Sequence, residues 1–362
     1  MVDALSALSE YQVSQQKAAS LSGALKNSRP PDLIIYDIGD GQVLDDPELL
    51  ATRRQNSRIP LVLVSGAITP EQMRQVIHMN AADLLTKPVD VRKLVEIIGD
   101  QLNVAHAAST QIYGFVSCVG GAGATSLAIN TADILCQRKR DARDATCLID
   151  LDFSTGACGS FIDAHNDFDL ESIVEHPNRI DVELMDTIRK SHPSGFSVYS
   201  FKLPNLPFRR TGEEFVLRML DVLSFKYDFV IVDIPYYETP WKSAALDGLT
   251  DAFLVTDLAI PSLRQTRDIY ERVRKGNIGS NRSTIIVNRH RMRMFFNSIS
   301  RRDVRKLFKD QPISFICDDH RTMTEAINRG ILPREVRSRS DFVRDATRAL
   351  TDHLKRNGSS LR

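Results

Sequence analysis

The sequence has little of what marks a secreted, membrane-spanning or metal-binding chain. Its cysteines are odd in number and scattered, without a C-x-x-C pair, which favours reduced thiols in a cytoplasmic protein over disulfides, metal ligation or thiol catalysis. No apolar run reaches the length of a transmembrane helix. The start, MVDALSALSEYQV, lacks the charged residues and long apolar stretch of a signal peptide. The cysteines are Cys118, Cys136, Cys147, Cys158 and Cys317.

The chain has 362 residues, 42% hydrophobic and 26% charged, which is ordinary for two or three globular domains. Its net charge of +1 is unevenly placed, because residues 264–309 hold 14 Lys or Arg and 3 Asp or Glu, a balance of 14 − 3 = +11. The rest of the chain then carries 1 − 11 = −10. A segment this basic fits an acidic partner, anionic lipid or nucleic acid, and solvated helix faces are the alternative.

Strand and helix patterns alternate along the first hundred residues. Continuous apolar strands between amphipathic helices predict a parallel sheet covered on both faces. The predicted strands are 11–16, 31–40, 59–66 and 82–87, and the predicted helices are 18–27, 47–55, 69–80 and 89–102.

A second set of strands begins at Ile112, after a short, small and polar stretch at 103–111. We therefore predict an α/β fold of two doubly wound parallel-sheet domains, over 1–102 and 112–362, with 103–111 as the linker. The strands of the second domain are predicted at 112–119, 145–152, 196–201, 227–235, 251–258, 283–289 and 313–319.

The stretch CVGGAGATS, residues 118–126, stands between an apolar strand and a helical pattern. Backbone N–H groups converge where such a turn opens a helix, which is the geometry that holds phosphate. Gly120, Gly121 and Gly123 permit the tight turn, and Thr125 or Ser126 offers a hydroxyl to Mg²⁺. A tight turn without any ligand is the alternative.

Three aspartates end predicted strands of the same sheet: Asp150 and Asp152 in CLIDLDF, and Asp233 in FVIVDIP. Ligands of parallel α/β sheets bind at the carboxyl ends of the strands, and Mg²⁺ prefers carboxylate and phosphate oxygens. Helix capping is the alternative role for each aspartate taken alone.

The succession GGAGATS, LIDLDFSTGACGSFID and YDFVIVDIP resembles the MinD/ParA class of deviant Walker ATPases. Within that class, IIVNRH and TEAINRG make the chain similar to the TadZ/CpaE pilus assembly family. The resemblance implies a P-loop fold that binds ATP and Mg²⁺, with Asp150 and Asp152 as the catalytic motif and Thr125 and Asp233 at the metal. The implied nucleotide-binding residues are Gly120, Gly121, Gly123, Ala124, Thr125, Ser126 and Asn288, the last near the adenine.

Two positions depart from the class pattern, K-G-G-x-G-K-[ST]. Val119 replaces the signature lysine and Ala124 the phosphate lysine. Each lost charged contact costs on the order of 1.5–3 kcal/mol of binding, and loss of a charge on the transferring phosphate costs roughly 10³–10⁵ in rate. We expect binding with little or no hydrolysis. Lys242, Arg291 and Arg293 are candidate replacement cations.

The front domain resembles a response-regulator receiver in PDLIIYDIGDG, LVLVSG and LLTKPVD. Asp37, Ser65 and Lys87 match the phospho-acceptor, the switch hydroxyl and the conserved lysine of that family. The acidic pair that holds Mg²⁺ in receivers is missing, because only Asp3 and Glu10 offer a carboxylate upstream. A pseudo-receiver used for docking or dimerisation is favoured over a phosphorylated switch.

The resemblance implies a cytoplasmic scaffolding or localisation factor for Flp/Tad-type pili, at a cell pole or the inner face of the membrane. Its implied partners are a second copy, the pilus secretion ATPase and inner-membrane platform proteins. The alternatives are an active partitioning ATPase with DNA on the basic segment, and a phosphorylated response regulator. The final amphipathic pattern at 340–356 packs on the sheet or lies on a membrane, the first being favoured, and Trp241 is expected to pack.

Overall fold

The structure is a computed structural model in which the chain divides into two compact units, Met1–Ser109 and Thr110–Arg362, called unit 1 and unit 2 below. It describes residues 5, 12–15, 31–38, 53, 59–66, 69, 73–74, 76–77, 79–138, 145–202, 210–275, 282–291, 299–309 and 311–357. The two units are treated separately.

Unit 1 contains a parallel sheet of three strands in the order β1-β2-β3. These are β1 (Ile34–Asp37), β2 (Leu61–Ser65) and β3 (Asp83–Thr86), and they confirm three predicted strands. The central strand β2 is fully buried, as its unbroken apolar sequence requires. Residues 12–15 have no regular structure, so the strand predicted over 11–16 was wrong where it is described. The helix predicted over 18–27 lies outside the described residues.

Helix α5 (Val91–Ser109) continues through most of the stretch taken from the sequence as a linker. Small alanines at this stretch are good helix formers, so a composition of small residues does not end a helix. Leu94, Ile97 and Ile98 of α5 pack with Val62 and Val64 of β2 in the core of unit 1. The division between the units falls at the end of α5, between Ser109 and Thr110.

Unit 2 is built on a sheet of eight strands in the order β11-β10-β9-β4-β8-β5-β7-β6. All neighbours are parallel except β6 and β7, which are antiparallel. The strands are β4 (Gln111–Ser117), β5 (Thr146–Asp150), β6 (Lys190–Ser191), β7 (Ser197–Tyr199), β8 (Phe229–Ile234), β9 (Asp251–Thr256), β10 (Ser283–His290) and β11 (Ile313–Cys317). The seven strands predicted for this domain are confirmed, and the two-residue β6 is additional.

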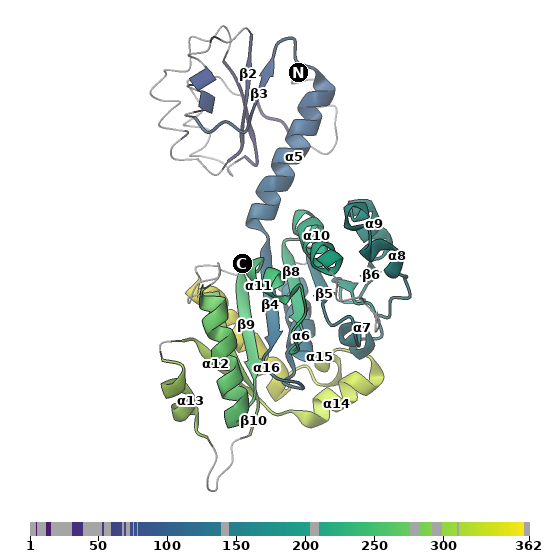
Figure 1. The fold of residues 1–362 in the computed structure, drawn as a ribbon, viewed down its shortest axis with the longest axis vertical. Coiled ribbons are helices and arrows are strands. Elements are labelled where there is room, and N and C mark those ends of the chain that lie inside the picture. Colours follow the sequence, from purple (N-terminus) through teal and green to yellow (C-terminus); the bar gives the residue numbers. More distant parts are fainter. Residues whose placement is uncertain are drawn as a thin grey trace. The chain divides into compact units, whose positions relative to one another are not determined.

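Helices cover both faces of this sheet, as expected for a doubly wound fold (Figure 1). One face carries α6 (Ala124–Arg138), α7 (Ala157–Phe161), α14 (His320–Arg329), α15 (Pro333–Val336) and α16 (Asp341–Arg356). The other carries α8 (Glu171–Val174), the 3₁₀ turn η2 (Pro177–Arg179), α9 (Val182–Thr187), α10 (Arg210–Lys226), α11 (Lys242–Asp247), α12 (Ile260–Lys275) and α13 (Arg301–Leu307).

The apolar side of α16 is buried against the sheet, which confirms the packing interpretation of this helix. Phe342, Ala346, Leu350 and Leu354 all belong to the core between α16 and the strands. Within the described part of the chain, no helix has the length and apolarity needed to cross a membrane. Trp241 is 3% exposed and meets the ring of Phe153 edge-on, so it packs as expected.

Candidate functional site

The CVGGAGATS loop leaves β4 at its carboxyl end and opens α6. Gly121 and Gly123 have φ values of 73° and 91°, a backbone conformation that favours glycine. A Cβ atom on Gly123 would lie 2.4 Å from Nδ2 of Asn288, so only glycine fits there. The strand, glycine turn and helix predicted from the sequence are therefore present, and the turn is a tight loop at the carboxyl end of the central strand β4.

Asn288 of β10 holds this loop in place. Its Nδ2 donates to the carbonyl oxygen of Ala122 at 2.8 Å, and the side chain is buried. The resemblance placed Asn288 near the adenine of a bound nucleotide, which stays a prediction. In the structure its amide contacts the loop backbone, a role that sequence reasoning did not assign.

The two strand-end aspartates of β5 and β8 lie side by side beneath the loop. Asp150 pairs in register with Asp233, and both carboxyl groups are buried. Burial, together with the neighbouring charge of Asp150, raises the pKa of Asp233 to about 8, against a hydrogen bond from Thr125 that lowers it. Burial raises the pKa of Asp150 less, to about 6, because three donors stabilise its charged form. Thr125 and Asp233, predicted together at a metal, are thus in contact.

The donors to Asp150 come from positions far apart in the sequence. The backbone N–H groups of Asp152 and Cys158 lie 2.9 Å from its oxygens, and Oγ of Ser200 lies 2.8 Å away. Sγ of Cys158 approaches Oδ2 of Asp233 at 3.6 Å. Ligand atoms of Asp150, Cys158 and Asp233 lie within 4.8 Å of one another. The sequence analysis gave no cysteine a place at a metal, and no spacing in the chain signals that Cys158 belongs here.

Asp152 is held by side chains that follow it and by the segment after β8. Oη of Tyr237 donates to its Oδ1 at 2.6 Å and Oγ1 of Thr155 to its Oδ2 at 2.9 Å, while the hydroxyl of Ser154 contacts Oδ1. Burial pushes the pKa of Asp152 upward, but the hydrogen bonds from Ser154, Tyr237 and Thr155 outweigh burial and lower it. Asp152 is therefore ionised and its oxygens are engaged.

These residues fit a magnesium nucleotide in part. Thr125 and Asp233 supply the hydroxyl and carboxylate oxygens that Mg²⁺ prefers, next to a glycine loop at a helix start. No Lys or Arg among the described residues forms an ion pair with Asp150 or Asp233. A divalent cation is the charge that these two buried carboxylates lack.

The positions of the two missing lysines differ in their surroundings. Val119 is half-buried and packs at the margin of the core beneath α6. Ala124, the first residue of α6, is 3% exposed and belongs to that core. An apolar contact thus occupies the position of the phosphate lysine.

Two of the three replacement cations considered from the sequence have other partners in the structure. Nζ of Lys242 donates to the carbonyl oxygens of Pro235, Tyr236 and Tyr237 at 3.0, 3.0 and 3.2 Å, so its three protons hold the segment after β8. Arg291 pairs with Asp318. Arg293 lies outside the described residues.

The receiver-like residues of unit 1 meet at the carboxyl edge of its sheet. Nζ of Lys87 pairs with Oδ1 of Asp37 at 2.7 Å, with both side chains partly exposed. Ser65 ends β2 and is buried, and its carbonyl oxygen accepts from the N–H of Lys87 at 2.7 Å. The structure thus brings Asp37 and Lys87 into contact and places Ser65 on the strand between theirs.

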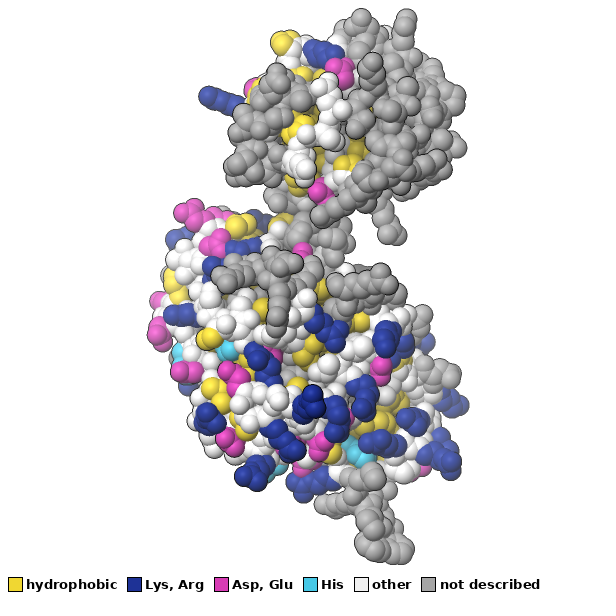
Figure 2. Space-filling view, turned by 180° about the vertical axis from the view of Figure 1, so that it is seen from behind, with side chains coloured by type: hydrophobic (Ala, Val, Ile, Leu, Met, Phe, Trp, Pro, Cys, Tyr) yellow, Lys and Arg dark blue, Asp and Glu magenta, His cyan; other side chains and the backbone are white. Residues whose placement is uncertain are grey.

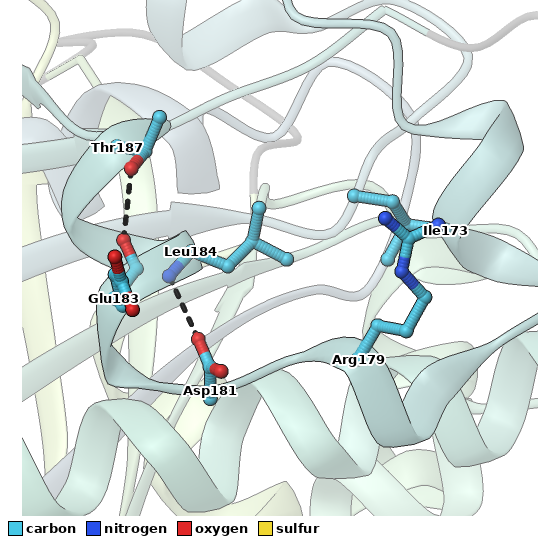
Figure 3. Close-up of a pocket in the computed structure, with 6 residues that line it drawn as sticks. All are labelled: Ile173, Arg179, Asp181, Glu183, Leu184 and Thr187. Atoms are coloured by element: carbon cyan, nitrogen blue, oxygen red, sulfur yellow. Dashed lines mark hydrogen bonds between the residues drawn. The ribbon is translucent and has the colours of Figure 1, made fainter.

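A surface hollow of about 400 Å³ lies on a different part of unit 2, between α8 and α9. Ile173, Arg179, Asp181, Glu183, Leu184 and Thr187 line it (Figure 3). Figure 3 shows Arg179 across the hollow from Asp181 and Glu183, with Leu184 between them. It contains none of the nucleotide-binding, metal or receiver-like residues predicted from the sequence.

No protein-family model and no curated protein sequence matches the chain. Solved structures do. A ParA family ATPase from Chlorobium tepidum TLS is similar over 67% of this chain and 98% of its own, with 23% identity and a TM-score of 0.56. The septum site-determining protein MinD from Pyrococcus horikoshii OT3, complexed with Mg-ADP, is similar over 69% and 98%, with 18% identity and a TM-score of 0.55.

A putative plasmid partition protein from Borrelia burgdorferi B31, bound to AMPPNP, is similar over 68% of this chain and 99% of its own, with 15% identity and a TM-score of 0.53. At these identities the likeness establishes architecture, and activity has to be argued from the site. The eight-stranded sheet with its glycine loop has the fold of the MinD/ParA-type P-loop ATPases.

Proposed function

We propose that unit 2 binds ATP with Mg²⁺ at the CVGGAGATS loop and uses the nucleotide as a dimer switch with little or no hydrolysis. The carrying observation is the contact between Thr125 and Asp233 beneath a glycine loop that has neither lysine of its class. The binding of Mg-ADP and AMPPNP by the two solved proteins supports the same ligand class.

In this proposal the loop backbone receives the phosphates, and Thr125 and Asp233 hold Mg²⁺, which supplies positive charge to the phosphate oxygens. Asp150 is a positioning residue, because its three donors fix the turn that carries Cys158. Asp152 would be the carboxylate that orients the attacking water, but its oxygens already accept hydrogen bonds from the hydroxyl groups of Tyr237, Thr155 and Ser154. Slow turnover follows from two causes, the missing lysines and the engaged carboxylate.

We further propose the cellular role that the TadZ/CpaE resemblance implies. The protein would act as a cytoplasmic scaffold for Flp/Tad-type pilus assembly, placed at a cell pole or the inner face of the membrane. It would engage the pilus secretion ATPase and inner-membrane platform proteins. Unit 1 would serve as a docking or dimerisation module, since only Asp3 and Glu10 stand where a receiver has the acidic pair that holds Mg²⁺.

Calorimetry of ATP and ADP with Mg²⁺, alongside sedimentation, tests the proposal. Gly123→Val introduces a side chain 2.4 Å from Nδ2 of Asn288 and is expected to abolish ATP binding and ATP-dependent dimer formation. Gly99→Ala is the matched control, because nothing lies within 4 Å of a Cβ at that helical position. Equal binding by wild type and Gly123→Val, or no binding by wild type, would refute the nucleotide switch.

One observation favours a second candidate, a partitioning ATPase that binds DNA. Helix α13 and the residues beside it expose Arg302, Arg305, Lys306 and Lys309. Binding of nonspecific DNA would weaken steeply as salt is raised, because cations on the phosphate backbone are released. A salt titration with fluorescent duplex DNA, together with steady ATP turnover, would establish this candidate in place of the scaffold.

A further inference from the structure

Unit 2 carries opposite charge at the two ends of its sheet. Residues 163–187, which contain α8, η2 and α9, hold 8 Asp or Glu and 1 Arg, a balance of 1 − 8 = −7. Residues 300–309, which contain α13, hold 5 Lys or Arg and 1 Asp, a balance of 5 − 1 = +4. We call these segments the acidic end and the basic end.

The fold places the two ends apart. The guanidinium groups of Arg301 and Arg305 lie 4.9 and 6.0 Å from the ring centre of Phe315 on β11, an outermost strand of the sheet. Helix α9 leads into β6, the outermost strand at the opposite end. Both ends rest on the same core face of the sheet. Figure 2 shows acidic side chains along the left edge of unit 2 and basic side chains along its right edge.

The charges at both ends are available to a partner. Arg302, Lys306 and Lys309 are exposed and form no ion pair with any described residue. Glu171 and Glu183 of the acidic end are exposed and equally unpaired within the described chain. The capping box of Ser300 and Asp303 fixes the start of α13, so its cations sit on a defined helix.

The acidic end also offers a shape for a basic side chain. Its hollow of about 400 Å³ has the carboxylates of Asp181 and Glu183 on one side, the apolar side chains of Ile173 and Leu184 as walls, and the guanidinium group of Arg179 on the opposite side (Figure 3). Lys and Arg bury an apolar stem and direct a charged head to carboxylates, which matches this lining. Each end also exposes one apolar residue, Val182 at 47% and Leu307 at 39%.

We propose that unit 2 associates head to tail with a second copy of this chain, with the basic end of one copy on the acidic end of the next. A polyanion would satisfy the basic end and leave the acidic end unpaired, whereas a second copy satisfies both. Such an interface is heterologous, so it forms rings or open chains rather than closed dimers. It is distant from the glycine loop and requires no nucleotide.

Sedimentation of the full chain without nucleotide tests this proposal. Wild type is expected to form concentration-dependent oligomers at about 0.05 M salt and to dissociate at about 0.5 M. Self-association should be at least about tenfold weaker at the higher salt concentration, because salt screens exposed ion pairs. Arg302→Glu/Lys306→Glu changes the basic end to 4 − 4 = 0 and is expected to abolish the oligomers, whereas Glu171→Lys/Glu183→Lys changes the acidic end to −7 + 4 = −3 and is expected to weaken them. A mixture of the two double variants restores complementary ends and is expected to restore association.

The control is Arg339→Glu/Lys355→Glu, which changes two exposed positions outside both ends. Its change in net charge equals that of Arg302→Glu/Lys306→Glu. It keeps the oligomers if the ends act locally and loses them if total charge decides. All substituted side chains are exposed, and melting temperatures near that of wild type verify folding. A monomeric wild type at low salt, unchanged oligomers in either double variant, or no restoration in the mixture overturns the proposal.

Discussion

At the scale of single residues, the site is defined by contacts between distant positions. Asp150, Asp152 and Asp233 were predicted from the sequence because each ends an apolar strand. Their partners Cys158, Ser200 and Tyr237 were not, since neither spacing nor composition links them to the aspartates. Lys242 was considered as a phosphate contact, but its Nζ donates to three backbone carbonyl oxygens, an alternative role that its place in the sequence does not reveal.

Asp233 gives the metal-free protein a pH-dependent stability. An unfolded aspartate loses its proton near pH 4, whereas burial keeps the proton on folded Asp233 to about pH 8. The stability that this proton contributes is complete below pH 4 and is lost as pH rises through 8. Without metal, the free energy of unfolding is expected to fall between pH 5 and pH 8, by at most about 1.4 kcal/mol per pH unit.

Asp233→Asn removes the titrating group while keeping its size, so its urea midpoint is expected to change less over this range. Glu335→Gln, an exposed acid outside the site, serves as control and keeps the slope of wild type. A slope that persists unchanged in Asp233→Asn would show that another group causes it.

At the scale of elements, the strands marked by hydrophobic periodicity or by apolar runs could be predicted from the sequence. Every strand predicted for unit 2 is present, because a long apolar run between polar segments is compatible with few structures other than a buried parallel strand. The two residues of β6 are too few for any period. The division between the units lies within the predicted stretch 103–111, but most of that stretch is helical in α5, since alanine-rich sequence is compatible with both a linker and a helix.

Helix α16 is fixed to the sheet by a buried polar chain as well as by its apolar side. Nε2 of His353 lies 2.8 Å from Oδ1 of Asp251 on β9, and its Nδ1 lies 2.8 Å from Oγ1 of Thr284 on β10. His353→Ala leaves a cavity and removes one hydrogen bond each from Asp251 and Thr284, which keep Asn357 and Arg356 as partners, so we expect a loss of about 2–4 kcal/mol in the free energy of unfolding. Urea unfolding measures it.

Lys355→Ala, an exposed neighbour on the same helix, is the comparison for His353→Ala and is expected to change stability by less than about 0.5 kcal/mol. If both variants lost the same stability, the buried chain would not be what fixes α16.

At the scale of the whole molecule, the two units have separate cores. The apolar clusters of unit 2 contain only residues from 112 onward, and those of unit 1 only residues up to 102. Thr110 belongs to unit 2, because its hydroxyl donates to the carbonyl oxygens of Ser224 and Tyr227. Each unit thus has the burial that independent folding requires.

Calorimetry is therefore expected to resolve two unfolding transitions in the full chain. A fragment of residues 110–362 should keep the transition of unit 2 within a few degrees, since no cluster residue is removed. A single transition in the full chain, or a fragment that fails to melt cooperatively, would contradict this independence.

The burial of Ala124 limits how the class pattern could be restored in this loop. A lysine substituted at this position alone would have to fit among the packed core side chains at the start of α6. A lysine could therefore be introduced at this position only together with changes in the neighbouring core side chains.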